Sequence, residues 1–70
     1  MNPGKTLRSF RKLHGLTQHD LAAYLFVSDA TISVWERNVC RISVEDFDKL
    51  LDYMGYKLII IKKKEKDYEQ

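Results

Sequence analysis

Helix-start signals recur along this chain and divide its first 55 residues into short helices. Thr17, Ser28 and Ser43 each precede an apolar repeat of helical spacing. A hydroxyl oxygen at such a position accepts a hydrogen bond from the backbone of the first turn. Asp20 and Asp46 follow two of these residues in the spacing of a capping box. Starts this frequent leave room only for short helices, so the sequence predicts a small helical bundle.

The apolar repeats place three helices at about residues 5–14, 18–25 and 29–37, and a fourth between Ser43 and Gly55. Gly15, Asn38 and Gly55 follow three of these helices, and such residues tolerate the left-handed backbone that commonly ends a helix. The expected core consists of the apolar stripes of the four helices.

The pattern changes after Gly55. The segment from Tyr56 to Ile61 is short and rich in β-branched residues, which predicts a buried strand rather than a fifth helix. A single strand has no backbone partner in an otherwise helical chain, so we predict that it pairs with the same strand of a second copy. The alternative is that this segment folds back on its own bundle and that helices form the dimer. The residues expected at the strand-paired dimer interface are Tyr56, Leu58, Ile59, Ile60 and Ile61.

Length, cysteine content and charge exclude several classes of protein. A core built from 70 residues is small, and the single cysteine, Cys40, forms no internal disulfide, so oligomerisation and a reducing, cytoplasmic compartment are expected. No apolar run approaches the roughly 20 residues of a membrane span. Residues 1–55 carry equal numbers of basic and acidic side chains, and the net charge of +2 arises entirely from residues 56–70. Charge alone therefore does not indicate nucleic-acid binding.

The sequence offers no constellation for catalysis or for metal binding. His14, His19 and Cys40 are the residues that could suggest a metal site, but their spacing fits no zinc motif. The other carboxylates scatter over helix surfaces, where a solvated face is the ordinary interpretation. We expect no enzymatic activity, no cofactor and no metal.

The helices at 18–25 and 29–37 are separated by a break of about three residues, a geometry that can lay the second helix in a major groove. Over about residues 5–55 the chain resembles the lambda-repressor and Cro-like (XRE-type) helix-turn-helix family. The residues that carry the resemblance are Gly15-Leu16-Thr17-Gln18, Leu21-Ala22, Val27-Ser28 and Thr31-Ile32-Ser33-Val34-Trp35-Glu36-Arg37. The resemblance implies a mainly α, four-helix bundle that binds operator DNA, followed here by one C-terminal strand.

The same resemblance implies roles for individual residues. Arg11 and Glu36 match a partly buried ion pair of the family. The first turns of the third helix read base edges, which implies base contacts by Asp29, Ala30, Thr31, Ser33 and Val34. Phosphate contacts are implied for Gln18, Ser28, Arg37 and Asn38.

Some of these positions also have a structural interpretation. Asp29 would accept a hydrogen bond from cytosine N4, or it would only favour the positive end of its helix. Ala30 and Val34 would touch thymine methyl groups, or their small size would only permit a close approach to the groove. Gln18 is otherwise an exposed helix-forming residue.

The turn before the third helix departs from the family pattern. Phe26 occupies the place where the family usually has glycine, and a left-handed backbone there costs a non-glycine residue about 1–2 kcal/mol. Either the turn is strained or it has another shape, and we expect the ring to pack partly in the core.

The sequence predicts a transcriptional repressor that binds a palindromic operator on double-stranded DNA as a homodimer. Residues 1–55 form the DNA-binding domain, 56–62 the dimerisation strand and 63–70 a flexible charged tail. The ending of the chain also resembles HipB-type antitoxins, so the alternative is an antitoxin whose main partner is a toxin protein. A toxin-binding tail usually carries apolar anchors, and only Tyr68 is of that kind in residues 62–70, which favours repression.

Overall fold

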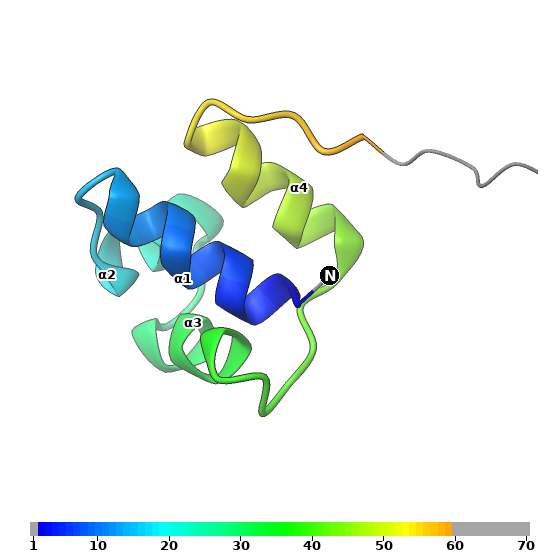
Figure 1. The fold of residues 1–70 in the computed structure, drawn as a ribbon. Helices are drawn as coiled ribbons and strands as arrows, with labels where there is room; N and C mark the ends of the chain where they lie inside the picture. Colours follow the sequence, from blue (N-terminus) through cyan, green and yellow to red (C-terminus); the bar gives the residue numbers. More distant parts are fainter. Residues whose placement is uncertain (1, 60–70) are drawn as a thin grey trace, which may run out of the picture.

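The computed structural model describes residues 2–59, and within them four α-helices follow one another (Figure 1). They are α1 (Pro3–Leu13), α2 (Gln18–Leu25), α3 (Asp29–Glu36) and α4 (Val44–Tyr53). The mainly α class and the expected order of helices are therefore confirmed. Helix α1 begins earlier than expected, because the Asn2 side chain accepts a hydrogen bond of 3.0 Å from the Lys5 backbone and Pro3 needs no such partner.

The three expected N-caps are formed. The Thr17 and Asp20 side chains accept hydrogen bonds from each other's backbone N–H groups, at 3.0 and 2.8 Å, and complete a capping box. Ser28 and Ser43 each accept one backbone hydrogen bond, at 3.2 and 3.1 Å. Because these bonds join residues three positions apart, they fix each helix start locally.

Each of the four helices in the described part of the chain is followed, one or two positions after its last residue, by a residue with positive φ. The backbone N–H of the residue after that bonds to a carbonyl five positions earlier. The four left-handed residues are Gly15 (φ 67°), Phe26 (59°), Asn38 (59°) and Gly55 (93°). The closing bonds run from Leu16 to Arg11 (3.0 Å), Val27 to Ala22 (3.0 Å), Val39 to Val34 (2.9 Å) and Tyr56 to Leu51 (2.8 Å). This is the Schellman ending, which favours glycine and tolerates asparagine.

Phe26 is therefore the one residue of the four that is unsuited to its backbone conformation. Its side chain is 95% exposed, so the expectation that the ring packs partly in the core is wrong. The strained alternative holds instead. The side chain stands in solvent at the end of α2, and no apolar surface within residues 2–59 covers it.

Replacing Phe26 by glycine should stabilise the fold. The substitution relieves about 1–2 kcal/mol of left-handed strain and costs roughly 0.5–1 kcal/mol of additional chain entropy, so the expected gain is about 1 kcal/mol. Urea unfolding measures it, with Phe26→Ala as the control that removes the ring but keeps the strain. A Phe26→Gly protein that unfolds more easily than the parent would contradict the prediction.

One fully buried aliphatic residue from each helix meets at the centre of the bundle. These residues are Leu7 of α1, Leu21 of α2, Ile32 of α3 and Leu50 of α4. Around them the core is completed by Ala22, Ile42, Phe47, Leu51 and Met54. The start of α1 lies so close to the end of α3 that Gly4 is buried against the backbone there.

The described segment after α4 lies on its own bundle. The Tyr56 ring stacks on Phe10 with centroids 4.5 Å apart, and its hydroxyl contacts His14 Nε2 at 2.8 Å. Leu58 also packs against the core, whereas Lys57 and Ile59 are exposed. Residues 56–59 are not in a strand in the single chain, which differs from the prediction, because residues 2–59 contain no other extended segment that could pair with them as a strand. Ile60, Ile61 and the charged tail lie outside the described residues.

No helix within residues 2–59 is both long enough and apolar enough to cross a membrane.

Candidate nucleic-acid interface

The outer face of α3 presents most of the residues expected to read bases. Asp29 and Ala30 are exposed, and Ser33 and Val34 are partly exposed. Ile32 lies on the opposite side of the helix, in the core. A turn of three residues, from Phe26 to Ser28, connects α3 to α2, and the two helices pack against each other. This is the arrangement in which a second helix can enter a groove while the first supports it.

Thr31 is placed differently from the other expected base contacts. Its hydroxyl lies 3.0 Å from the Ser28 hydroxyl, and its backbone N–H donates to the same Ser28 oxygen. Thr31 is partly buried at the edge of the face. The two side chains therefore form the cap of α3 in the structure.

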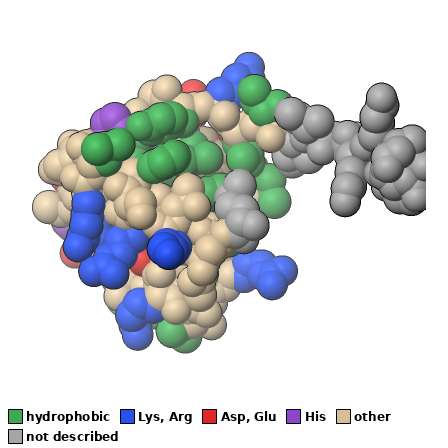
Figure 2. Space-filling view, in the orientation of Figure 1, with side chains coloured by type: hydrophobic (Ala, Val, Ile, Leu, Met, Phe, Trp, Pro, Cys, Tyr) green, Lys and Arg blue, Asp and Glu red, His purple; other side chains and the backbone are tan. Residues whose placement is uncertain are grey.

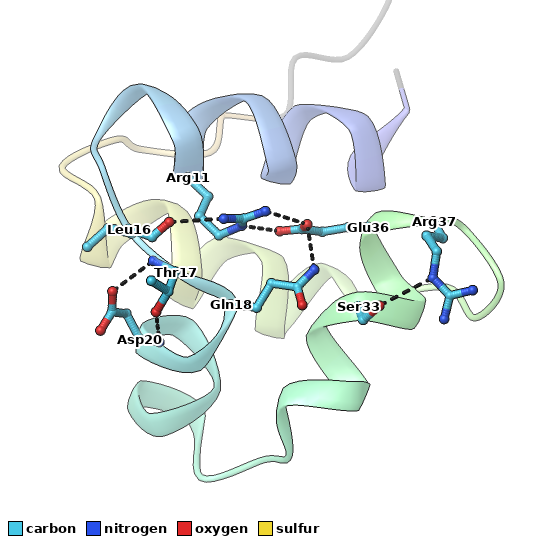
Figure 3. Close-up of polar contacts among 8 residues, drawn as sticks. All are labelled: Arg11, Leu16, Thr17, Gln18, Asp20, Ser33, Glu36 and Arg37. Carbon is cyan, nitrogen blue, oxygen red and sulfur yellow. Dashed lines mark hydrogen bonds and ion pairs between the residues drawn. The ribbon is translucent and has the colours of Figure 1, made fainter.

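A polar cluster ties α1, α2 and α3 together beside this face (Figure 3). Arg11 donates to both carboxylate oxygens of Glu36, from Nε to Oε2 at 2.7 Å and from Nη2 to Oε1 at 3.0 Å. Its Nη1 donates to the Leu16 carbonyl at 3.0 Å. The two side chains are only 11% and 2% exposed. The hydrogen bonds to Glu36 raise the pKa of Arg11 above its ordinary value, so the guanidinium stays charged.

Gln18 belongs to the same cluster. Its Nε2 donates to Glu36 Oε1 at 3.1 Å, so the amide is held at the start of α2 (Figure 3). The hydrogen bond leaves the other N–H of the amide for a phosphate oxygen. The structure thus shows what orients Gln18, while its contact with a phosphate stays a prediction.

A groove with basic walls runs between α1 and α3. We call it the basic groove. Figure 2 shows Lys and Arg side chains gathered on the side of α1 that faces α3, and hydrophobic side chains on the side that faces the end of α4. The groove is lined by Arg8, Arg11, Lys12, Gln18, Ser33, Glu36 and Arg37. Because Arg11 and Glu36 neutralise each other, Arg8, Lys12 and Arg37 supply its net positive charge.

Sequence reasoning did not identify Arg8 and Lys12. They stand four positions apart on α1 and thus on one helix face, beside Arg11. That spacing indicates a basic helix face, but the equal numbers of basic and acidic side chains in residues 1–55 gave no reason to look for one. Arg37, by contrast, was expected, and its Nε donates to Ser33 Oγ at 3.2 Å (Figure 3).

Asn38 directly follows Arg37 at the C-terminal end of α3. Its side-chain amide donates to Asn2 Oδ1 at 2.9 Å, which links the end of α3 to the cap of α1. This contact and the left-handed backbone give Asn38 a structural role in addition to any phosphate contact.

Two packed helices joined by a tight turn, with a polar face on the second and a basic groove beside it, define a helix-turn-helix DNA-binding domain. Residues 7–61 match the model of the family described as Helix-turn-helix, so the chain belongs to this XRE-type, lambda-repressor and Cro-like family. It is a DNA-binding regulator. Searches of curated proteins and of solved structures found no match. The HipB-type resemblance of the ending stays a prediction.

Proposed function

We propose that this protein is a transcriptional repressor that binds a palindromic operator as a homodimer. The observation that carries the proposal is the exposed face of α3 lying directly beside the basic groove. Side chains on the helix face would read base edges, and cations in the groove would hold the sugar-phosphate backbone. A repressor needs no more than this, because occupying an operator excludes other proteins from it.

In this proposal the residues divide into two groups by the part of DNA that they touch. Base edges would be read by Asp29, Ala30, Ser33 and Val34, with Thr31 at the margin. Phosphates would be held by Gln18, Ser28, Arg37 and Asn38, as the resemblance implies, and by the newly placed Arg8 and Lys12. Arg11 and Glu36 would keep the three helices in register without touching DNA.

Base readers and phosphate-binding residues should respond differently to substitution. Changing Val34 to leucine should alter the sequence selected from a random duplex library at defined positions, by about 1–3 kcal/mol per base contact. Arg8→Ala and Lys12→Ala should leave the selected sequence unchanged. Each should make the slope of log affinity against log salt concentration shallower by about 0.9 for every phosphate that is no longer neutralised. A dimer carries each substitution twice, so it loses two such contacts.

Lys49→Ala is the matched control, because Lys49 lies on α4 and pairs with Glu45 at 3.9 Å. Its salt dependence should equal that of the parent. An affinity that does not change between low and moderate salt would refute phosphate binding in the basic groove, and an unchanged selected sequence for Val34→Leu would refute reading by α3.

The dimer interface that we propose is the segment from Tyr56 to Ile61. Tyr56 and Leu58 hold the segment on the bundle, while Ile59 is 67% exposed and turned away from it. The same segment of a second copy would satisfy the backbone groups and cover Ile59. A two-fold axis here would present two copies of α3 about 34 Å apart, as successive major grooves require.

Charge at Ile59 should disrupt the dimer without harming the monomer, because the side chain is exposed in the single chain. We expect Ile59→Lys to sediment as a monomer and to bind its selected duplex at least about tenfold more weakly, since one half-site must then hold the protein alone. Val39→Lys is the control for sedimentation, because Val39 is similarly exposed, at 63%, but lies after α3. A dimeric Ile59→Lys protein would contradict strand pairing.

The antitoxin alternative stays a prediction. The segment that distinguishes it, residues 62–70, lies outside the described residues.

A further inference from the structure

The two helices of the helix-turn-helix are joined by a contact between a histidine and a carboxylate, which is an ion pair when the histidine is protonated. His19, in the first turn of α2, lies with Nδ1 3.0 Å from Oδ1 of Asp29, in the first turn of α3. An ionised carboxylate only accepts hydrogen bonds, so Nδ1 is the donor. The side chains are 75% and 59% exposed, and a pair this exposed contributes little to stability. Asp29 lies on the exposed face of α3 that is proposed to read bases, so a role in base reading is the better explanation of the contact.

A carboxylate on that face has an electrostatic difficulty. Near DNA it is repelled by the phosphates, and if it is free to rotate it contacts no particular base. The His19 imidazolium removes both difficulties, because it balances the charge and occupies Oδ1. The second oxygen, Oδ2, then remains free in one orientation.

We propose that His19 is a positioning residue for base reading: it holds Asp29 so that Oδ2 accepts a hydrogen bond from the N4 amino group of a cytosine in the major groove. This inference rests on the proposed function, in which α3 reads the operator. It also favours one of the two interpretations of Asp29, as a base reader rather than only a favourable charge at the start of its helix.

The charges around His19 make this arrangement dependent on pH. The hydrogen bond from His19 to Asp29, together with the charge of Asp29, raises the pKa of His19 above its ordinary value of 6.5, and the charge of Asp20 adds to this. The remaining charged groups of α3 and its cap, Glu36 and Arg37, lie at the opposite end of the helix. Helix α4, which also packs on α2, carries Glu45, Asp46, Asp48, Lys49 and Asp52.

A raised pKa means that His19 is mostly protonated below pH 6.5 and loses its proton as the pH rises through the raised value. The charge-assisted bond to Asp29 is then replaced by a weaker neutral one. Discrimination in favour of cytosine should therefore be greatest at low pH and should decrease as the pH rises.

The test begins with a duplex selected by the parent protein from a random library at about pH 6, below the ordinary pKa of histidine. Affinity is then compared between this duplex and copies in which each cytosine pair is replaced in turn. The cytosine pair read by Asp29 is the one whose replacement no longer matters to the Asp29→Ala protein. For this pair, the parent should bind the selected duplex roughly tenfold more tightly than the replaced one at about pH 6. This affinity ratio should decrease severalfold by about pH 8, above the ordinary pKa of histidine. His19→Ala should abolish this ratio and keep the ratios at the pairs read by Val34.

Two further variants separate positioning from mere loss of a side chain. His19→Asn places a neutral amide N–H close to the position of Nδ1, so it should recover the smaller ratio that the parent shows near pH 8, with its neutral hydrogen bond, and keep it at every pH. His14→Asn, which removes the other histidine of the chain, should leave both the ratio and its pH dependence intact, because His14 contacts Tyr56 instead.

The outcomes distinguish this inference from the proposed function. A parent protein that selects no sequence would refute both. Two outcomes would refute the role of His19 alone. In the first, the parent selects a sequence, but His19→Ala shows the same affinity ratios at its cytosine pairs. In the second, the ratio of the parent does not change with pH.

Discussion

Replacing Arg11 by methionine should destabilise this protein by about 3–5 kcal/mol, which is the usual consequence of removing one partner from a buried ion pair. Glu36 is 2% exposed at its side chain and, within residues 2–59, would retain only the Gln18 amide as a partner. The Leu16 carbonyl would also lose its donor. A domain of 70 residues has a total stability of about 4–10 kcal/mol, so the variant should be largely unfolded or close to it in thermal and urea melts.

The double replacement of Arg11 and Glu36 by methionine is the informative control. With both charges removed, no buried carboxylate is left without a partner, and pairs of this kind are often replaced by apolar residues at little cost. We therefore expect the double variant to be more stable than Arg11→Met by several kcal/mol. An Arg11→Met protein that loses less than about 1 kcal/mol would show that water reaches Glu36 readily and that the pair is not structural.

Gly4→Ala should also destabilise the protein, although alanine normally favours a helix over glycine by roughly 0.5–1 kcal/mol. A Cβ atom at Gly4 would overlap the Trp35 carbonyl oxygen and would lie 2.9 Å from that of Glu36. Both are backbone atoms of α3, so α1 itself must move away. Overpacking of this kind costs about 1–3 kcal/mol, and the rigid contacts here place the expected net loss near 2 kcal/mol.

Ser9→Ala is the matched control, because Ser9 lies exposed on the same helix and its replacement should change the stability by less than about 0.5 kcal/mol. Urea unfolding of both variants gives the comparison. If Gly4→Ala were as stable as the parent, the close approach of α1 to α3 would be wrong. A shift of α1 would also disturb Arg11, so the variant should bind DNA more weakly even where it remains folded.

Features that arise from bonds between near neighbours could be predicted from the sequence alone. The cap hydroxyls of Thr17, Ser28 and Ser43 act on residues three positions away, and the left-handed residues Gly15 and Asn38 act on the turn just before them. The order of the helices and nearly all of their bounds followed from these signals. The family resemblance added the Arg11 and Glu36 pairing, which local physics cannot show.

Whatever depends on the angles at which helices cross became visible only in the packed bundle. The approach of Gly4 to α3, the assembly of Arg8 and Lys12 with Arg37 into one groove, and the contact of His19 with Asp29 each join separate helices. Phe26 shows the same division at one residue. Its position in the family pattern predicted either a strained left-handed turn or a turn of another shape. Whether the ring packs in the core depended on where α2 ends relative to its neighbours. The structure leaves the ring in solvent, 95% exposed, because the packed helices of residues 2–59 present no surface against it.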